Sequence, residues 1–104
     1  FEEKLKTYNW IHAYPNMVAV VHSLWYCRND FNKALRILAD CGADVDCNAG
    51  EVCCAMGAMN PDCIDPRWTE PFNNQLETYV PGFESMEITA LARWTYEIYR
   101  KLQA

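Results

Sequence analysis

The sequence is poor in positive charge and has no long apolar run. Its 104 residues hold 9 Lys and Arg against 14 Asp and Glu, which gives a net charge of -5 at pH 7. Such a chain attracts phosphate backbones and anionic membranes weakly, which argues against nucleic-acid binding through a basic face. No apolar segment approaches the roughly 18–20 residues of a membrane span. The acidic start Phe1-Glu2-Glu3 is not typical of a signal peptide, and we expect no membrane partner.

Histidine is scarce, and the familiar catalytic patterns are missing. His12 and His22 are the only histidines. The sequence contains no serine–histidine–aspartate order, no phosphate-binding loop and no dinucleotide fingerprint. No CxxC pair stands at zinc-site spacing from a histidine, so a zinc site is not expected. The composition, with 51% hydrophobic residues and four Trp, instead indicates one globular domain with an ample core.

Cysteine is abundant in this chain, and its presence can be interpreted as a disulfide framework or as reduced thiols. An even number of cysteines in a short chain can indicate a disulfide framework. Cys53 and Cys54, however, lie in an apolar helical run, and the core needs no covalent staples. We therefore favour reduced cysteines and a cytoplasmic location, with a redox or thiol-binding domain as a weaker hypothesis. The six positions are Cys27, Cys41, Cys47, Cys53, Cys54 and Cys63.

The spacing of apolar residues predicts an all-α fold. Neither an alternating strand pattern nor an internal repeat is present. The predicted helices cover 17–27, 31–41, 47–59 and 86–102, with a short helical turn at 66–68 and irregular chain over 71–81 that includes one turn at 74–78. The predicted N-caps are Asn16, Asp30, Asp46 and Ser85, and Gly42 suits the left-handed position after the second helix.

The sharpest local feature is an Asp-x-Asp pair in the tight loop before the third predicted helix. Asp44 and Asp46 are spaced i, i+2, so in an extended loop their carboxylates point to the same side and can reach one hard cation. The plainer interpretation makes Asp46 a helix cap and Asp44 a turn residue. Spacing alone leaves both interpretations open.

Three further side chains are weighed for chemistry. His12 lies among aromatic residues and Asn16, as a residue of a pocket wall would, whereas His22 fits a partly buried histidine of the first helix. Cys47 at a helix N-terminus would have a lowered pKa, but the two neighbouring carboxylates act in the opposite direction. We do not expect Cys47 to be a nucleophile.

The loop and its surroundings resemble the ADP-ribosylglycohydrolase family. Residues 38–49 are similar to the second metal signature of that family, Gly-x-Asp-Thr-Asp-Thr, which precedes a small-residue helix with a Gly-Ala step. Gly57-Ala58 matches that step, and Asp65-Pro66-Arg67-Trp68 resembles the Pro-x-x-Trp element after it, with one residue fewer between Pro66 and Trp68. Residues 11–16 and 30–35 look like the stretch that precedes the signature. The resemblance therefore runs in order along nearly the whole chain.

The resemblance implies an all-α bundle that hydrolyses the glycosidic bond of ADP-ribosylated substrates with two divalent ions, usually magnesium. By it, Asp44 and Asp46 are metal ligands, together with Cys47, which stands where the family commonly has Thr and is a poorer ligand for magnesium. ADP-ribose or an ADP-ribosylated substrate is the implied partner. His12, Asn16 and Asn48 are the candidates for the substrate-binding wall.

The other family signature, a Thr/Ser-Asp-Asp cluster, has no match in residues 1–104. We therefore expect the chain to be the C-terminal part of such a hydrolase, with half a metal site, inactive without the missing N-terminal half. The alternative is a non-enzymatic helical module that self-associates. Either way a homo-oligomer is expected, because a partial bundle exposes apolar faces, and Trp94, Tyr96 and Tyr99 offer one such surface.

Overall fold

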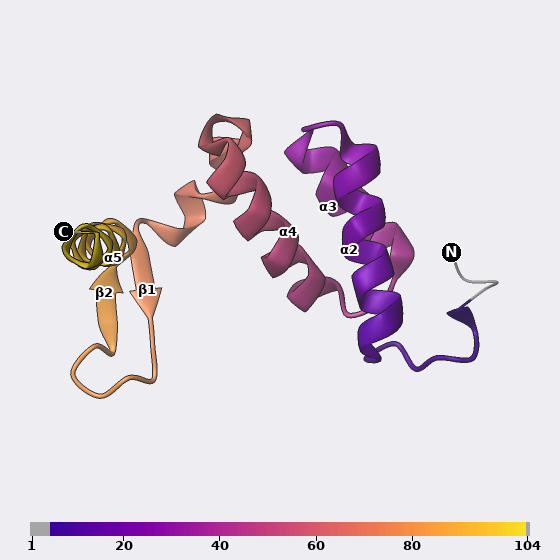
Figure 1. Ribbon diagram of the computed structural model, residues 1–104, viewed down its shortest axis with the longest axis horizontal. Coiled ribbons are helices and arrows are strands. Elements are labelled where there is room, and N and C mark those ends of the chain that lie inside the picture. Colours follow the sequence, from indigo (N-terminus) through magenta and orange to yellow (C-terminus); the bar gives the residue numbers. More distant parts are fainter. Residues whose placement is uncertain (1–4, 104) are drawn as a thin grey trace. The chain divides into compact units, whose positions relative to one another are not determined.

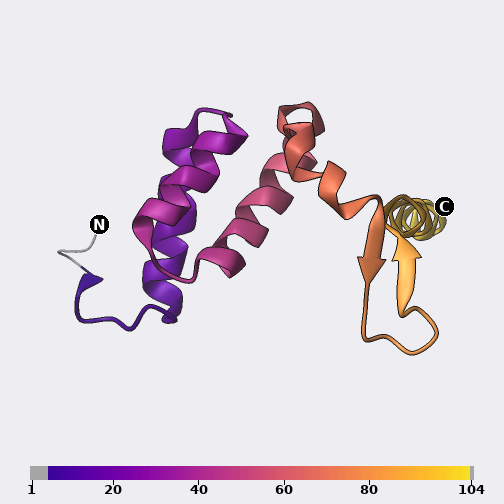
Figure 2. The same ribbon diagram turned by 180° about the vertical axis from the view of Figure 1, so that it is seen from behind.

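The first part of the chain folds as three α-helices that pack against one another (Figures 1 and 2). The computed structural model describes residues 5–103, which divide between Asp65 and Pro66 into two units. No helix in this described range is both long and apolar enough to cross a membrane. The elements of the first unit are α2 (Ala13–Cys27), α3 (Phe31–Cys41), α4 (Val45–Met59) and a 3-10 turn, η1 (Pro61–Cys63).

The core of the first unit lies where these three helices meet. It consists of eight buried side chains, which are Ala19, Val20, Cys27, Phe31, Ala34, Leu38, Val52 and Met56. Ser23 is also fully buried, and its hydroxyl donates to the carbonyl of Ala34 over 2.9 Å, so the polar group of α2 is paired inside the core. Gly57 of α4 lies where a Cβ would approach Ile64 Cδ1 to 3.3 Å, so glycine suits this contact. All six cysteines are free thiols.

The ends of α2 and α3 show which predicted caps are correct. Asp30 caps α3, because its carboxylate accepts the N–H of Lys33 over 2.9 Å, as predicted. Gly42 ends α3 in the left-handed conformation with φ 65°, also as predicted. The prediction for α2 was wrong: this helix begins at Ala13, and the N-cap is His12 rather than Asn16. The Nδ1 atom of His12 accepts the N–H of Tyr14 over 3.1 Å, and Pro15 has no N–H that needs a partner.

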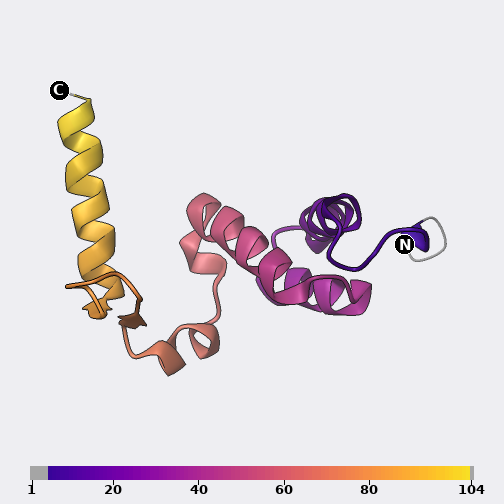
Figure 3. The ribbon, with the colours of Figure 1, turned by 90° about the horizontal axis from the view of Figure 1, so that it is seen from below.

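The second unit contains a short hairpin and the last helix. Its elements are two 3-10 turns, η2 (Pro66–Trp68) and η3 (Glu70–Phe72), two strands, β1 (Gln75–Glu77) and β2 (Ser85–Glu87), and α5 (Ile88–Leu102). The strands are antiparallel, with Leu76 opposite Met86. Figure 3 shows α5 along its length. The helical turn predicted at 66–68 is confirmed.

Asn74, which precedes β1, makes hydrogen bonds to the first two residues of α5. Its carbonyl accepts the N–H of Ile88 over 3.0 Å, and its side chain both accepts from the Thr89 N–H and donates to the Thr89 hydroxyl. Ser85, the predicted cap, is a residue of β2 instead. The predicted turn at 74–78 and the predicted helix start at Met86 were therefore wrong, because Gln75–Glu77 and Ser85–Glu87 pair with each other as strands. The all-α class is confirmed, since strand is confined to these two three-residue segments of the described chain.

Candidate metal centre

The Asp-x-Asp pair lies at the junction of α3 and α4. The chain leaves α3 through the left-handed Gly42 and enters α4 at Val45. Asp44 is the N-cap residue of α4, whereas Asp46, which we predicted as the cap, lies in the first turn of the helix. The Asp44 side chain makes no capping hydrogen bond, so its carboxylate is not used to satisfy the helix end. Negative side chains are favoured at a helix N-terminus, which accounts for two aspartates in this place.

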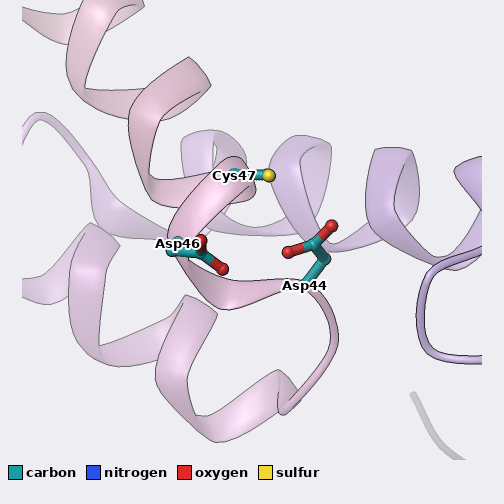
Figure 4. A group of neighbouring side chains, drawn as sticks. All are labelled: Asp44, Asp46 and Cys47. Atoms are coloured by element: carbon teal, nitrogen blue, oxygen red, sulfur yellow. The ribbon is translucent and has the colours of Figure 1, made fainter.

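Two carboxylates and one thiol face a common space at this junction (Figure 4). One ligand atom each from Asp44, Asp46 and Cys47 lies within 4.8 Å of the others. Asp44 is half-buried, whereas the other two residues are exposed. Among residues 5–103, no other group of three or more histidine, cysteine or acidic side chains comes together in this way. The carboxylates of Asp44 and Asp46 therefore do converge, although Asp46 lies in the first turn of α4 and not in an extended loop, and their role as metal ligands stays a prediction.

The thiol of Cys47 is a hydrogen-bond donor in this group. It donates to the Asp44 carboxylate, and this bond, with the charges of Asp44 and Asp46, raises the pKa of the Cys47 thiol above its usual value. A thiol with a raised pKa is a weak nucleophile and a poor ligand near neutral pH. The carboxylate oxygens are thus the donors that suit a cation, and they suit a hard one such as Mg²⁺.

Asn16 and Asn48 connect α2 to this junction. The Oδ1 atom of Asn16 accepts two hydrogen bonds, from the backbone N–H of Asp44 over 2.9 Å and from Nδ2 of Asn48 over 2.7 Å. The Nδ2 atom of Asn16 donates to the carbonyls of Trp10 and His12, over 2.8 and 3.0 Å. Asn48 is buried and Asn16 is half-buried. Two of the three predicted substrate-wall residues, Asn16 and Asn48, therefore lie next to the Asp-x-Asp loop, and the contact of all three with substrate stays a prediction.

Aromatic residues that were not assigned to the predicted site also lie beside the Asp-x-Asp loop. A hollow of about 250 Å³ lies beside Gly42 and Ala43, and Tyr8, Trp10 and Pro15 contribute to its wall. The ring of Tyr8 lies 4.9 Å from that of His12, between centroids. In the sequence, the signal for this aromatic wall was the order Tyr8-Asn9-Trp10 shortly before α2. His22, expected to be partly buried, is exposed instead and its ring lies 4.6 Å from that of Tyr26.

Comparison with known proteins gives one finding. A family model described as ADP-ribosylglycohydrolase matches residues 1–104, the whole sequence. No curated protein and no solved structure matched in the corresponding comparisons. The family match confirms the resemblance first seen around residues 38–49, and it covers both units of the described structure. The chain belongs to the ADP-ribosylglycohydrolase family.

Proposed function

We propose that this chain contributes part of the divalent-metal site of a hydrolase that cleaves the glycosidic bond of ADP-ribosylated substrates. The observation that carries the proposal is the convergence of Asp44 and Asp46, with oxygens within 4.8 Å, at the start of α4. The family assignment supplies the reaction class, and the two carboxylates supply a chemically suitable place for a cation.

The donor set fits a hard cation such as Mg²⁺ but does not fill its coordination. Two carboxylate side chains account for a minority of the roughly six positions around Mg²⁺. We propose that the other positions are taken by water, by substrate oxygens and by protein ligands from outside residues 5–103. A divalent cation bound here supplies Lewis-acid polarisation of substrate oxygens and a more acidic bound water.

The residues of this chain have distinct tasks in the proposed site. Asp44 and Asp46 bind the cation, and their negative charges are favoured by the positive end of the α4 dipole. Cys47 lies beside the two carboxylates, and its soft sulfur is a poorer ligand for Mg²⁺ than their oxygens. The hollow beside the loop is lined in part by Tyr8 and Trp10, whose aromatic rings offer faces on which a nucleobase can stack.

The proposal is tested by the release of ADP-ribose from ADP-ribosylated protein in the presence of Mg²⁺, quantified by chromatography. We expect only background release from the chain alone, because its metal coordination is incomplete. Release is expected when a segment carrying the Thr/Ser-Asp-Asp signature is added, and Asp44→Asn in that mixture should lower the rate about 100-fold. Equal rates of release with Asp44→Asn and with the unaltered chain would contradict a role of the Asp-x-Asp pair in the reaction.

A second candidate function, self-association, is favoured by the exposed face of α2. Met17, Val21 and Trp25 lie around a hollow of about 320 Å³ on this helix, and Trp25 is 76% exposed. Apolar patches of this kind commonly mark protein–protein contacts. If α2 forms such a contact, light scattering should give a dimer whose population rises with concentration, and Trp25→Ser should shift it to monomer. A monomer at all micromolar concentrations would rule this function out.

A further inference from the structure

The Asp-x-Asp loop is tied to α2 through a single side chain. Asn16 lies 28 residues before Asp44 in the sequence, yet its Oδ1 atom accepts the Asp44 backbone N–H. Asp44 precedes the first turn of α4, and its own side chain makes no capping bond. The Asp44 N–H thus donates to a side chain of another helix. Because that N–H belongs to a proposed metal ligand, the bond fixes the backbone from which the carboxylate projects.

Every hydrogen-bonding position of the Asn16 side chain is used. A carboxamide has two N–H donors and two acceptor lone pairs. The two donors bind the carbonyls of Trp10 and His12, and the two lone pairs accept from Asp44 and Asn48. The donors therefore orient the Asn16 amide group from the α2 side, and this orientation directs Oδ1 at the loop.

Asn48 supports the same arrangement from α4. It is only 4% exposed, so its Nδ2 group would lose a partner inside the protein if Asn16 were removed. Asn48 also lies one helical turn after Asp44, and its backbone N–H donates to the Asp44 carbonyl over 3.0 Å. Asp44 is consequently held at its N–H by Asn16 and at its carbonyl by Asn48.

We propose that Asn16 is a positioning residue for the metal loop, and that Asn48 acts through Asn16. Asn16 binds no cation itself; it presets the Asp44 backbone so that the two carboxylates converge before the cation arrives. This inference rests on the proposed function where it concerns metal affinity, but its structural part, the fixing of the Asp44 backbone, is measurable without metal.

The first test measures hydrogen exchange of the Asp44 amide by NMR, without metal, in the chain and in Asn16→Ala. We expect the Asp44 amide to exchange about 10-fold faster in Asn16→Ala, while the Val52 amide in the middle of α4 keeps its rate. Asn60→Ala, a matched change beyond the other end of α4, should alter neither. An unchanged Asp44 rate in Asn16→Ala would overturn the inference.

The second test measures Mn²⁺ and Mg²⁺ affinity by calorimetry at a temperature where all variants are folded. Loss of a partner that orients a metal ligand typically weakens binding about 10-fold or more, and we expect this for Asn16→Ala. Asn48→Ala should weaken binding less, and should add nothing in the Asn16→Ala background. Val20→Ala, which removes buried methyl groups from the same helix, should lower stability and leave affinity unchanged.

These readouts separate the inference from the proposed function. If the unaltered chain binds neither ion even when the segment with the Thr/Ser-Asp-Asp signature is added, the proposed metal site fails, and the exchange rate of the Asp44 amide alone decides the role of Asn16. If the chain binds Mn²⁺ and Asn16→Ala binds it equally well, the inference fails while the metal site stands. Equal weakening by Val20→Ala would reduce Asn16 to a residue of general stability and would also overturn the inference.

Discussion

Replacing both aspartates, in the variant Asp44→Ala/Asp46→Ala, is expected to weaken Mn²⁺ binding by roughly 100-fold or more, since ligand charge sets the affinity of such oxygen sites. The reason is that the two side chains supply both carboxylates that converge at the start of α4. Folding should be retained, because Asp46 is exposed and the Asp44 side chain makes no capping bond. The α4 helix begins with backbone bonds that do not depend on either carboxylate.

The measurement is paramagnetic line broadening by Mn²⁺, observed residue by residue by NMR, with circular dichroism as the check on folding. In the unaltered chain, broadening should centre on residues 44–47. Asp62→Asn, an exposed aspartate in η1 beyond the other end of α4, is the matched control and should leave this pattern unchanged. Broadening that persists at residues 44–47 in the double variant would contradict the assignment of both ligands.

The largest expected effect on stability follows from Leu38→Ala. Leu38 is 1% exposed and belongs to the cluster that α2, α3 and α4 share. Truncating a buried leucine costs about 2–5 kcal/mol, because transfer free energy is lost and a cavity remains. A unit of this length has a free energy of unfolding of only about 3–9 kcal/mol. Leu38→Ala should therefore bring the first unit close to unfolding, and the metal loop with it.

Urea unfolding followed by circular dichroism checks this expectation. The matched control is Leu102→Ala, the same chemical change at the end of α5, where leucine is 79% exposed. Its unfolding midpoint should stay within error of the unaltered chain, because an exposed side chain leaves no cavity. Equal midpoints for Leu38→Ala and Leu102→Ala would mean that the three-helix cluster is not what holds the first unit together.

The helices could be predicted because their signals are local. Apolar residues at helical spacing predicted α2, α3 and α5, a capped run of small residues predicted α4, and Asp30 and Gly42 marked the ends of α3 in the way that capping chemistry requires. The start of α2 was missed because histidine is not a usual cap, although His12 Nδ1 accepts a hydrogen bond as a cap does. The hairpin was missed because strands of three residues are too short to show alternation, and their pairing joins residues that are eight to twelve positions apart.

In the candidate site, too, the contacts between sequence neighbours could be predicted and the contacts between distant residues could not. The i, i+2 spacing of Asp44 and Asp46 predicts their convergence, since residues this close in the sequence have few ways to separate, even though Asp46 belongs to the first turn of α4. The bond from Asn16 to Asn48 could not be predicted in the same way, because it joins residues 32 positions apart and depends on how α2 packs against α4. Sequence reasoning grouped both asparagines near the substrate, but it had no means to find that they bind each other and the loop.

The full use of the Asn16 side chain has a consequence for which amino acids this position accepts. Aspartate has the same shape but no donors, and would place a carboxylate against the carbonyls of Trp10 and His12. Serine offers one donor, and glutamine carries the same group one methylene further from the backbone. No other side chain reproduces two donations and two acceptances from this point of α2. A change at position 16 would therefore have to be accompanied by changes at position 48 and in the loop, so these three places along the chain are expected to vary together or not at all.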